Sequence, residues 1–190
     1  MLQLVRPAQE HLPGYIAALE RGWSPNNERA DAGFEELDQI NADPAGFLAS
    51  MDDPEGKGPP VKMPDGSLVP RLPGYRRWLW DREFCGSIAI RWQPGTATLP
   101  AYCLGHIGYT VVPWKRRRGY ATVALRLLLP EARALGLPYV ELTTDAKNAI
   151  SHQVIVANGG VLAGHFKKPA QYGSTPALRY RINLSPAGKD

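Results

Sequence analysis

The fold is decided by residues 107–136, which read IGYTVVPWKRRRGYATVALRLLLPEARALG. The β-branched and aromatic residues at 107–112 predict a strand, and Pro113 ends it. Apolar residues then recur at helical spacing over 120–135, and Gly136 is a natural C-terminal stop for a helix. A strand therefore leads through a basic turn directly into an amphipathic helix.

The same reasoning predicts the elements on either side of this stretch. Strands are expected at 2–6, 77–80, 84–92, 139–144, 161–165 and 177–184, and helices at 12–23, from Asp43-Pro44 onward, and at 149–157. Hairpin, strand, helix, strand, helix, strand and strand then follow in order. This order predicts an α/β fold with a mixed central β-sheet flanked by α-helices. We expect one domain over residues 1–190.

An unusual segment at about 28–73 reads as an insertion in that domain. Its first part, 28–55, holds nine acidic residues against the single basic Arg29. Asp43 followed by Pro44 is typical of a helix start, because Asp caps free N–H groups and Pro fits the first helical position. The rest, 54–73, is rich in Pro and Gly and predicts turns or an ordered loop.

The turn before the long helix is suited to binding a phosphate or pyrophosphate. The first N–H groups of a helix have no intrahelical partner, and the helix dipole adds partial positive charge there. Gly119 and Ala121 keep bulky side chains away from this point. The alternative is that Arg116, Arg117 and Arg118 form a solvated basic turn. The spacing matches neither G-x-G-x-x-G nor G-x-x-x-x-G-K-[ST], which disfavours a Rossmann or P-loop site.

The pattern Arg116-x-x-Gly119-x-Ala121, after a strand that ends in Val-Val-Pro, resembles motif A of the GNAT superfamily of acetyl-CoA-dependent N-acetyltransferases. Asn148, Ser151 and the run Asn158-Gly159-Gly160 follow at distances similar to motif B of that family. The resemblance covers about residues 87–162. It implies a single-domain GNAT-like fold.

The resemblance also implies a cofactor, acetyl-CoA, and the residues that would bind it. Backbone amides at Tyr109, Thr110, Val111 and Val112 would hold the acetyl carbonyl and the pantetheine arm, and Arg116, Arg117, Arg118, Gly119, Tyr120, Ala121 and Thr122 would bind the pyrophosphate. Asn148 and Ser151 would contact the pantetheine. For Asn148 an N-cap is the alternative, and for Ser151 a packed helix face.

The implied reaction is direct transfer of the acetyl group to a primary amine in a ternary complex. A base must take a proton from the amine, and an acid must protonate the departing thiolate. We predict His106 as the base, with a buried structural histidine as the alternative. For the acid the sequence offers Tyr109 and Tyr120 nearby, with packing in the core or against the cofactor as the alternative for both, and we place Tyr109 in the catalytic set. The sequence departs from the family at Ile155, where many members have a catalytic Tyr.

The acidic segment suggests a hypothesis about the acceptor. In this superfamily the N-terminal helices and the loop after them help to form the acceptor pocket, and residues 28–55 lie in that part of the chain. A cationic amine would be attracted there, whereas the alternative is a solvated acidic face. A second class also stays open, a coenzyme-A-binding sensor or interaction module without catalysis, which the missing Tyr favours.

Composition limits the other possibilities. The 190 residues are 44% apolar and 21% charged, which is typical of a globular chain. The net charge of +4 comes from scattered residues and one short basic cluster, and nucleic-acid binding would need a continuous basic stripe. Two cysteines, no leader-like start and no long apolar run favour a soluble, cytoplasmic protein without a membrane partner. No metal-site spacing occurs, and the oligomeric state stays open between monomer and homodimer.

Overall fold

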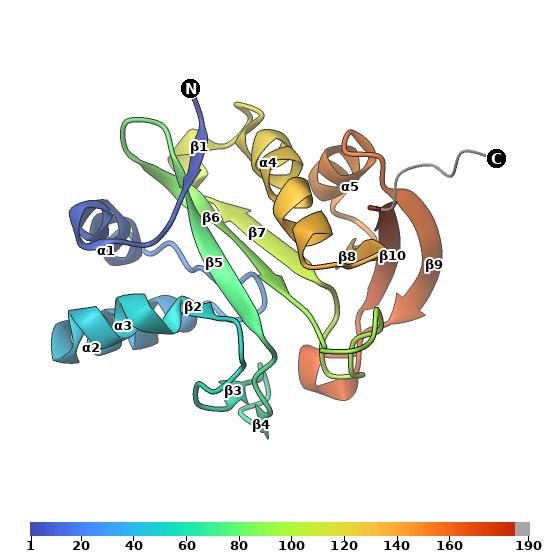
Figure 1. Ribbon diagram of the computed structural model, residues 1–190, viewed down its shortest axis with the longest axis horizontal. Helices are drawn as coiled ribbons and strands as arrows, with labels where there is room; N and C mark the ends of the chain where they lie inside the picture. Colours follow the sequence, from blue (N-terminus) through green and yellow to red (C-terminus); the bar gives the residue numbers. More distant parts are fainter. Residues whose placement is uncertain (185–190) are drawn as a thin grey trace.

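The computed structural model describes residues 1–184 and contains two large antiparallel sheets (Figure 1). The first has the strand order β1-β5-β6-β7, formed by Gln3–Val5, Gly74–Trp80, Phe84–Arg91 and Ile107–Val111, and β2 (Asp52–Asp53) pairs with β5. The second has the order β8-β10-β9, formed by Tyr139–Asp145, Pro176–Asn183 and Val161–Lys167. The predicted α/β fold is confirmed, but the expected central sheet is divided between β7 and β8.

Helices cover both faces of the first sheet. On one face α4 (Tyr120–Ala134) covers the sheet, and α5 (Ala149–Val156) lies beside it against β8. Both contribute to the larger core, in which Leu125 and Leu128 of α4 pack with Ile88 of β6. On the other face α1 (Leu12–Glu20), α2 (Ala32–Ala42) and α3 (Pro44–Ser50) form a second, aromatic-rich core around Trp78. Figure 1 shows these two groups of helices on opposite sides of β5 and β6. The helix expected at 12–23 ends earlier, because Gly22 adopts a left-handed φ of 82°.

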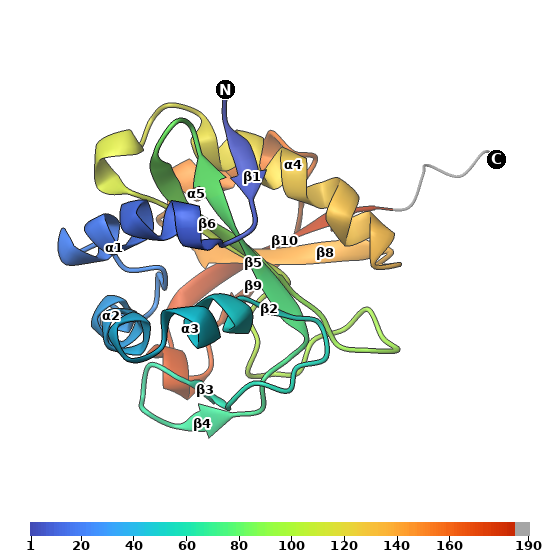
Figure 2. The ribbon, with the colours of Figure 1, turned by 60° about the vertical axis from the view of Figure 1, so that its left-hand side comes forward.

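The segment 28–73 contains more regular structure than its sequence predicts. Asp43 caps α3 as expected, accepting a hydrogen bond from the Gly46 N–H at 2.9 Å. α2, inside the acidic part, and a small hairpin of β3 (Val61–Lys62) and β4 (Leu68–Val69) were not predicted. Figure 2 shows α2, α3 and this hairpin gathered on one side of the molecule. Three short 3-10 helices, η1 (Gln9–His11), η2 (Pro113–Lys115) and η3 (Ala170–Tyr172), complete the elements.

The two sheets meet at the start of β7 and then separate. β7, α4 and β8 form a strand–helix–strand crossover, which returns the chain to the edge of β7. The His106 N–H donates to the Glu141 carbonyl oxygen at 2.8 Å, and a Cβ on Gly105 would lie 2.9 Å from the same oxygen. Beyond this contact β7 and β8 belong to different sheets. The far end of β7 therefore has backbone groups that no neighbouring strand uses.

Among residues 1–184, no helix combines the length and the apolar character that a membrane crossing requires.

Candidate functional site

The turn between η2 and α4 presents a run of unpaired backbone N–H groups. Arg117 and Gly119 both adopt left-handed backbone conformations, with φ of 62° and 75°. The first bond that closes the helix runs from the Val123 N–H to the Gly119 carbonyl at 3.0 Å. Within the described part of the chain, no acceptor pairs with the N–H groups of residues 117–122. These groups form a site in which an anion would satisfy them.

The basic residues of this turn have different environments. Lys115 forms an ion pair with Glu83, and the Arg116 Nε donates to the Val111 carbonyl oxygen at 3.1 Å. Arg117 and Arg118 are exposed, and no carboxylate of residues 1–184 lies within ion-pair distance of either. Two guanidinium groups are thus available beside the N–H groups for a phosphate.

The ladder between β6 and β7 decides which β7 amides face away from the sheet. The Val112 N–H donates to the Cys85 carbonyl oxygen at 3.0 Å, so the backbone groups of Val112 point toward β6. Hydrogen-bonded and non-bonded pairs alternate in an antiparallel ladder, and the register pairs Tyr109 with Ile88 and Val111 with Gly86. The backbone groups of Tyr109 and Val111 therefore point to the open side, where the sheets separate.

Side chains already occupy the carbonyl oxygens on that open side. The Asn27 side chain donates to the Tyr109 carbonyl oxygen at 2.9 Å, and Arg116 donates to that of Val111. Their N–H groups are consequently the ones left for a ligand. Asn27 was not singled out by sequence reasoning, because an Asn in a loop has no signal that links it to a strand 82 residues away.

The other two predicted residues, Thr110 of β7 and Val112 directly after it, support the site without facing it. Val112 is fully buried in the aromatic-rich core, and its N–H donates to the Cys85 carbonyl oxygen. The Thr110 hydroxyl oxygen accepts a hydrogen bond from the Trp23 indole at 3.2 Å, which joins β7 to the segment that follows α1. Of the four predicted amides, the structure brings Tyr109 and Val111 to the open side and turns Thr110 and Val112 toward β6.

The start of α5 lies near the same place. The Asn148 side chain caps α5, accepting a hydrogen bond from the Ser151 N–H at 3.1 Å, as the alternative interpretation expected. The Tyr109 hydroxyl is buried and lacks a partner in hydrogen-bond geometry among the described residues. Burial raises the pKa of this phenol, an effect that the nearby Ser151 side chain partly opposes. Tyr109 thus keeps its proton at neutral pH.

The two other positions considered for a phenolic acid do not supply one. Ile155 is buried in the larger core, and a Cβ on Gly160 would meet its side chain at 2.3 Å. The Tyr120 hydroxyl donates to Asp81 at 2.7 Å, and Asp81 also binds the N-terminal ammonium at 2.9 Å. Tyr120 is therefore held against the β5–β6 turn.

His106 occupies a closed environment. It is fully buried, and its Nδ1 accepts a hydrogen bond from the Glu141 N–H at 3.0 Å. Nδ1 is therefore unprotonated, and burial lowers the pKa of the imidazole. Glu141 binds Arg181 at 2.8 Å. An acceptor amine has no surface through which it could reach the ring, so the geometry favours the structural alternative for His106.

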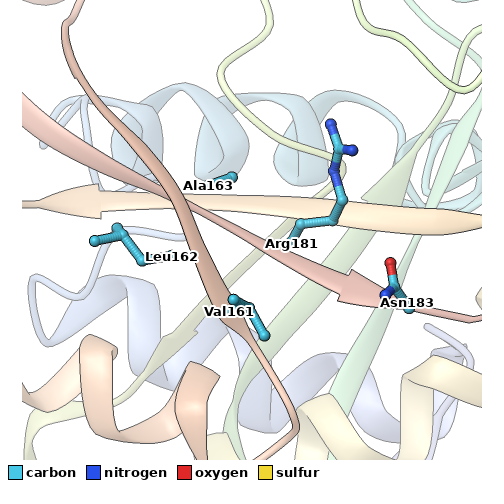
Figure 3. Close-up of a pocket in the computed structure, with 5 residues that line it drawn as sticks. All are labelled: Val161, Leu162, Ala163, Arg181 and Asn183. Atoms are coloured by element: carbon cyan, nitrogen blue, oxygen red, sulfur yellow. The ribbon is translucent and has the colours of Figure 1, made fainter.

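A cleft of about 540 Å³ lies on the α1–α3 side of the first sheet. Ser87 and Ala89 of β6 and Gly108 of β7 line its floor, and residues of the segment 28–73 form much of its wall. The cleft reaches Tyr109, so it opens onto the predicted acyl site. A second hollow, of about 410 Å³, lies over β9 and β10, between Val161 and Arg181 (Figure 3). It touches none of the predicted site residues.

No group of three or more His, Cys, Asp or Glu side chains in residues 1–184 is arranged to hold a metal ion.

Comparison with known proteins identifies the family. A model of the acetyltransferase (GNAT) domain matches residues 68–161, a stretch that includes the basic turn and the β7 amides. This chain has a GNAT acetyltransferase domain. A search of curated proteins finds no significant match.

Solved structures with a similar fold agree with this assignment. The microcin C7 self-immunity acetyltransferase MccE, in complex with acetyl-CoA and AMP, has a TM-score of 0.62 at 13% identity, covering 96% of this chain and 92% of its own. RimL, a ribosomal L7/L12 α-N-protein acetyltransferase in complex with coenzyme A, has a TM-score of 0.61 at 12% identity, with coverages of 96% and 93%. A putative ribosomal-protein-serine acetyltransferase from Vibrio cholerae reaches 0.59 at 14%, with coverages of 96% and 93%.

Proposed function

We propose that this GNAT protein is an N-acetyltransferase that moves the acetyl group of acetyl-CoA directly to a primary amine, through a ternary complex. The observation that carries the proposal is the unpaired N–H run of residues 117–122, which lies just beyond the outward-facing amides of Tyr109 and Val111. The first set suits a pyrophosphate, and the second suits a pantetheine arm and an acyl carbonyl.

The residues present fit acetyl-CoA in charge and in hydrogen-bonding capacity. The exposed guanidinium groups of Arg117 and Arg118 supplement the backbone donors, and Gly119 places no side chain over them. The MccE and RimL structures, which have this fold, contain acetyl-CoA and coenzyme A. When bound, acetyl-CoA supplies an acyl group already activated as a thioester.

The chain's own groups would stabilise the negative charge that develops on the acyl group and would protonate the leaving thiolate. The N–H of Tyr109 or Val111 is positioned to donate to the oxyanion that develops on the acyl oxygen when the amine attacks the thioester carbon. The buried, protonated Tyr109 hydroxyl is the acid that we assign to the departing thiolate. His106 is enclosed, so the acceptor enters from the cleft as the free amine. The rate at subsaturating acceptor should therefore rise with pH toward the pKa of the amine, about 10.4 for an alkyl amine.

One observation favours the second candidate, a coenzyme-A-binding module without catalysis. The position of the usual catalytic Tyr is the buried Ile155, and the predicted base is enclosed. Such a module would keep the pyrophosphate site and would not turn over.

Two measurements on one preparation test the proposal. Calorimetry should detect acetyl-CoA binding, and a thiol-release assay should show coenzyme A appearing only when a primary amine is added. Binding without amine-dependent release, over a panel of polyamine, aminoglycoside, amino-acid and peptide acceptors, would assign the protein to the second class. Absence of binding would exclude both candidates.

A further inference from the structure

The acidic residues that line the cleft are already engaged. Glu35 binds both Arg29 at 2.6 Å and Lys62 at 2.7 Å. Glu36 binds Arg76 at 2.9 Å and also accepts a hydrogen bond from Tyr15. These carboxylates neutralise cations of the same wall, so they offer little free negative charge to an incoming ligand.

The two remaining acidic residues of the cleft are likewise occupied. Glu28 binds the buried Lys168 at 2.7 Å. Asp53 accepts backbone hydrogen bonds from Lys57 at 3.0 Å and from Gly58 at 2.9 Å. The hypothesis of a cationic acceptor drawn to the acidic segment therefore loses its electrostatic support in the cleft, because the four carboxylates that line it are engaged within the protein.

Arg91 differs from Arg29, Lys62 and Arg76, the cations of the cleft that form ion pairs. No carboxylate among residues 1–184 lies within ion-pair distance of it, and its polar contact with the Gly105 carbonyl oxygen is long, 3.5 Å from a terminal nitrogen. By contrast, Arg71 of the same cleft donates from Nε to the Pro59 carbonyl at 2.9 Å. A guanidinium carries five N–H donors in a fixed planar fork, so Arg91 has donors available for a ligand.

The Arg91 guanidinium lies next to the acyl site. A Cβ built on Gly108 would be 3.4 Å from its Nη2, so the guanidinium sits against the residue that precedes Tyr109. Arg91 and Gly108 both line the cleft, together with the small residues Ser87 and Ala89. Because Ser87, Ala89 and Gly108 carry small side chains or none, this part of the cleft leaves room for a small molecule between Arg91 and the Tyr109 amide.

We propose that Arg91 binds a carboxylate of the acceptor, and that the acceptor is a small amino acid or peptide-like molecule whose carboxylate lies within a few bonds of its amine. This inference rests on the proposed function and names the acceptor class for the same site. An arginine fork and a carboxylate form paired, charge-assisted hydrogen bonds, which fix both distance and orientation. Binding there would hold the amine beside the outward-facing amides of β7.

Matched acceptors and matched variants test this. The wild-type protein should acetylate an amino acid with a kcat/KM at least tenfold above that of the corresponding amino-acid amide, which keeps the amine and lacks the carboxylate. In Arg91→Gln, KM for the amino acid should rise about tenfold or more, and the value for the amide should change little. Arg91→Lys should recover only part of the affinity, because an ammonium lacks the planar fork. Arg126→Gln, on the exposed face of α4, removes one positive charge elsewhere and should match the wild type.

The outcomes separate this inference from the function on which it rests. If wild type turns over amides or polyamines at least as well as amino acids, or if Arg91→Gln affects both acceptor types equally, the carboxylate site is excluded while the acetyltransferase stands. If no amine is acetylated by a protein that binds acetyl-CoA, the proposed function itself fails. Unchanged acetyl-CoA affinity in Arg91→Gln verifies that the variant is folded.

Discussion

His106 and Glu141 exchange two hydrogen bonds at the point where β7 and β8 meet. The His106 N–H donates to the Glu141 carbonyl at 2.8 Å, and the Glu141 N–H donates to the His106 Nδ1 at 3.0 Å. The imidazole thus substitutes for a backbone acceptor where the ladder between the two strands stops. We infer that these two hydrogen bonds fix the point at which the two sheets separate.

A structural His106 predicts a specific result for His106→Asn. The Asn side-chain oxygen can accept the Glu141 hydrogen bond in place of Nδ1, but the smaller side chain leaves part of the buried site empty. We expect a loss of about 1–3 kcal/mol in the free energy of unfolding, with kcat per folded molecule within a few-fold of wild type. Chemical denaturation and steady-state kinetics measure the two quantities. A fall in kcat of a hundredfold or more would instead identify His106 as the base.

The same residue predicts how stability depends on pH. Burial lowers the pKa of folded His106 below its unfolded value of about 6.5. Between these two values the unfolded chain binds more protons, so stability is fully present above about pH 6.5 and declines as the pH falls, by at most about 1.4 kcal/mol per pH unit. Denaturation curves from pH 7.5 to 5 should show this decline in wild type. The curves of His106→Asn should be flatter, and equal slopes would argue against a buried neutral histidine.

Gly119 offers a test of the pyrophosphate site that controls for backbone strain. Gly119 and Gly136 have nearly the same left-handed φ, 75° and 78°, and a Cβ on either would meet nothing within 4 Å. Valine at each position should therefore cost similar stability, about 1–2 kcal/mol. Only Gly119→Val places a branched side chain over the free N–H groups, and it should raise the Kd for acetyl-CoA at least tenfold. Calorimetry that gives equal affinities in the two variants would exclude this turn as the binding site.

The sequence predicts residues 107–136, where the cofactor would bind, better than it predicts the segment 28–73 and the cleft that this segment helps to form. The strand, turn and helix at 107–136 form within a few residues of their predicted limits, because local periodicity and a Gly stop determine them. Even Pro130 lies inside a continuous α4, where the surrounding packing of Leu128 and Ala132 outweighs one lost hydrogen bond.

The acceptor side depends on contacts that local sequence cannot reveal. The acidic stretch reads as a charged surface, and α2 within it was missed. Its charges are paired with cations distant in sequence, such as Lys62, 27 residues from Glu35, and Lys168, 140 residues from Glu28. Arg91, at the end of a strand, has no feature in the sequence that separates it from a surface arginine. Only the assembled cleft shows that Arg91 lines it and that no carboxylate of residues 1–184 pairs with this guanidinium.

Because the Tyr109 hydroxyl has no hydrogen-bond partner among the described residues, its removal should lower kcat without changing stability or acetyl-CoA affinity. Tyr109→Phe removes a hydroxyl that has no hydrogen-bond partner among the described residues, so the free energy of unfolding should change little. If the phenol protonates the departing thiolate, kcat should fall about a hundredfold with the acetyl-CoA affinity unchanged. Tyr139→Phe, which removes a phenol at the start of β8, is the matched control. Wild-type kcat in Tyr109→Phe would show that the thiolate leaves without this acid.

Lys168 connects residues 21–31, the loop between α1 and α2 that we call the acceptor loop, to Asp145 of β8. Its removal should affect both stability and acceptor binding. Burial lowers its pKa, but hydrogen bonds to Asp145 at 2.8 Å and Glu28 at 2.7 Å more than compensate, so the net pKa is raised and the ammonium stays charged. In Lys168→Met the two carboxylates, 57% and 34% exposed, can rehydrate. The loss should therefore be about 1–2 kcal/mol, below the 3–5 of a fully buried pair.

Glu28 follows Asn27, whose side chain holds the Tyr109 carbonyl at 2.9 Å, so a loosened loop should disturb the β7 amides as well. We expect Lys168→Met to raise the acceptor KM several-fold more than it raises the Kd for acetyl-CoA, because the pyrophosphate turn lies on another segment of the chain. Lys167→Met removes the neighbouring, exposed charge and is the matched control. If both variants change the acceptor KM and the free energy of unfolding equally, the Lys168 ion pairs do not hold the acceptor loop in place.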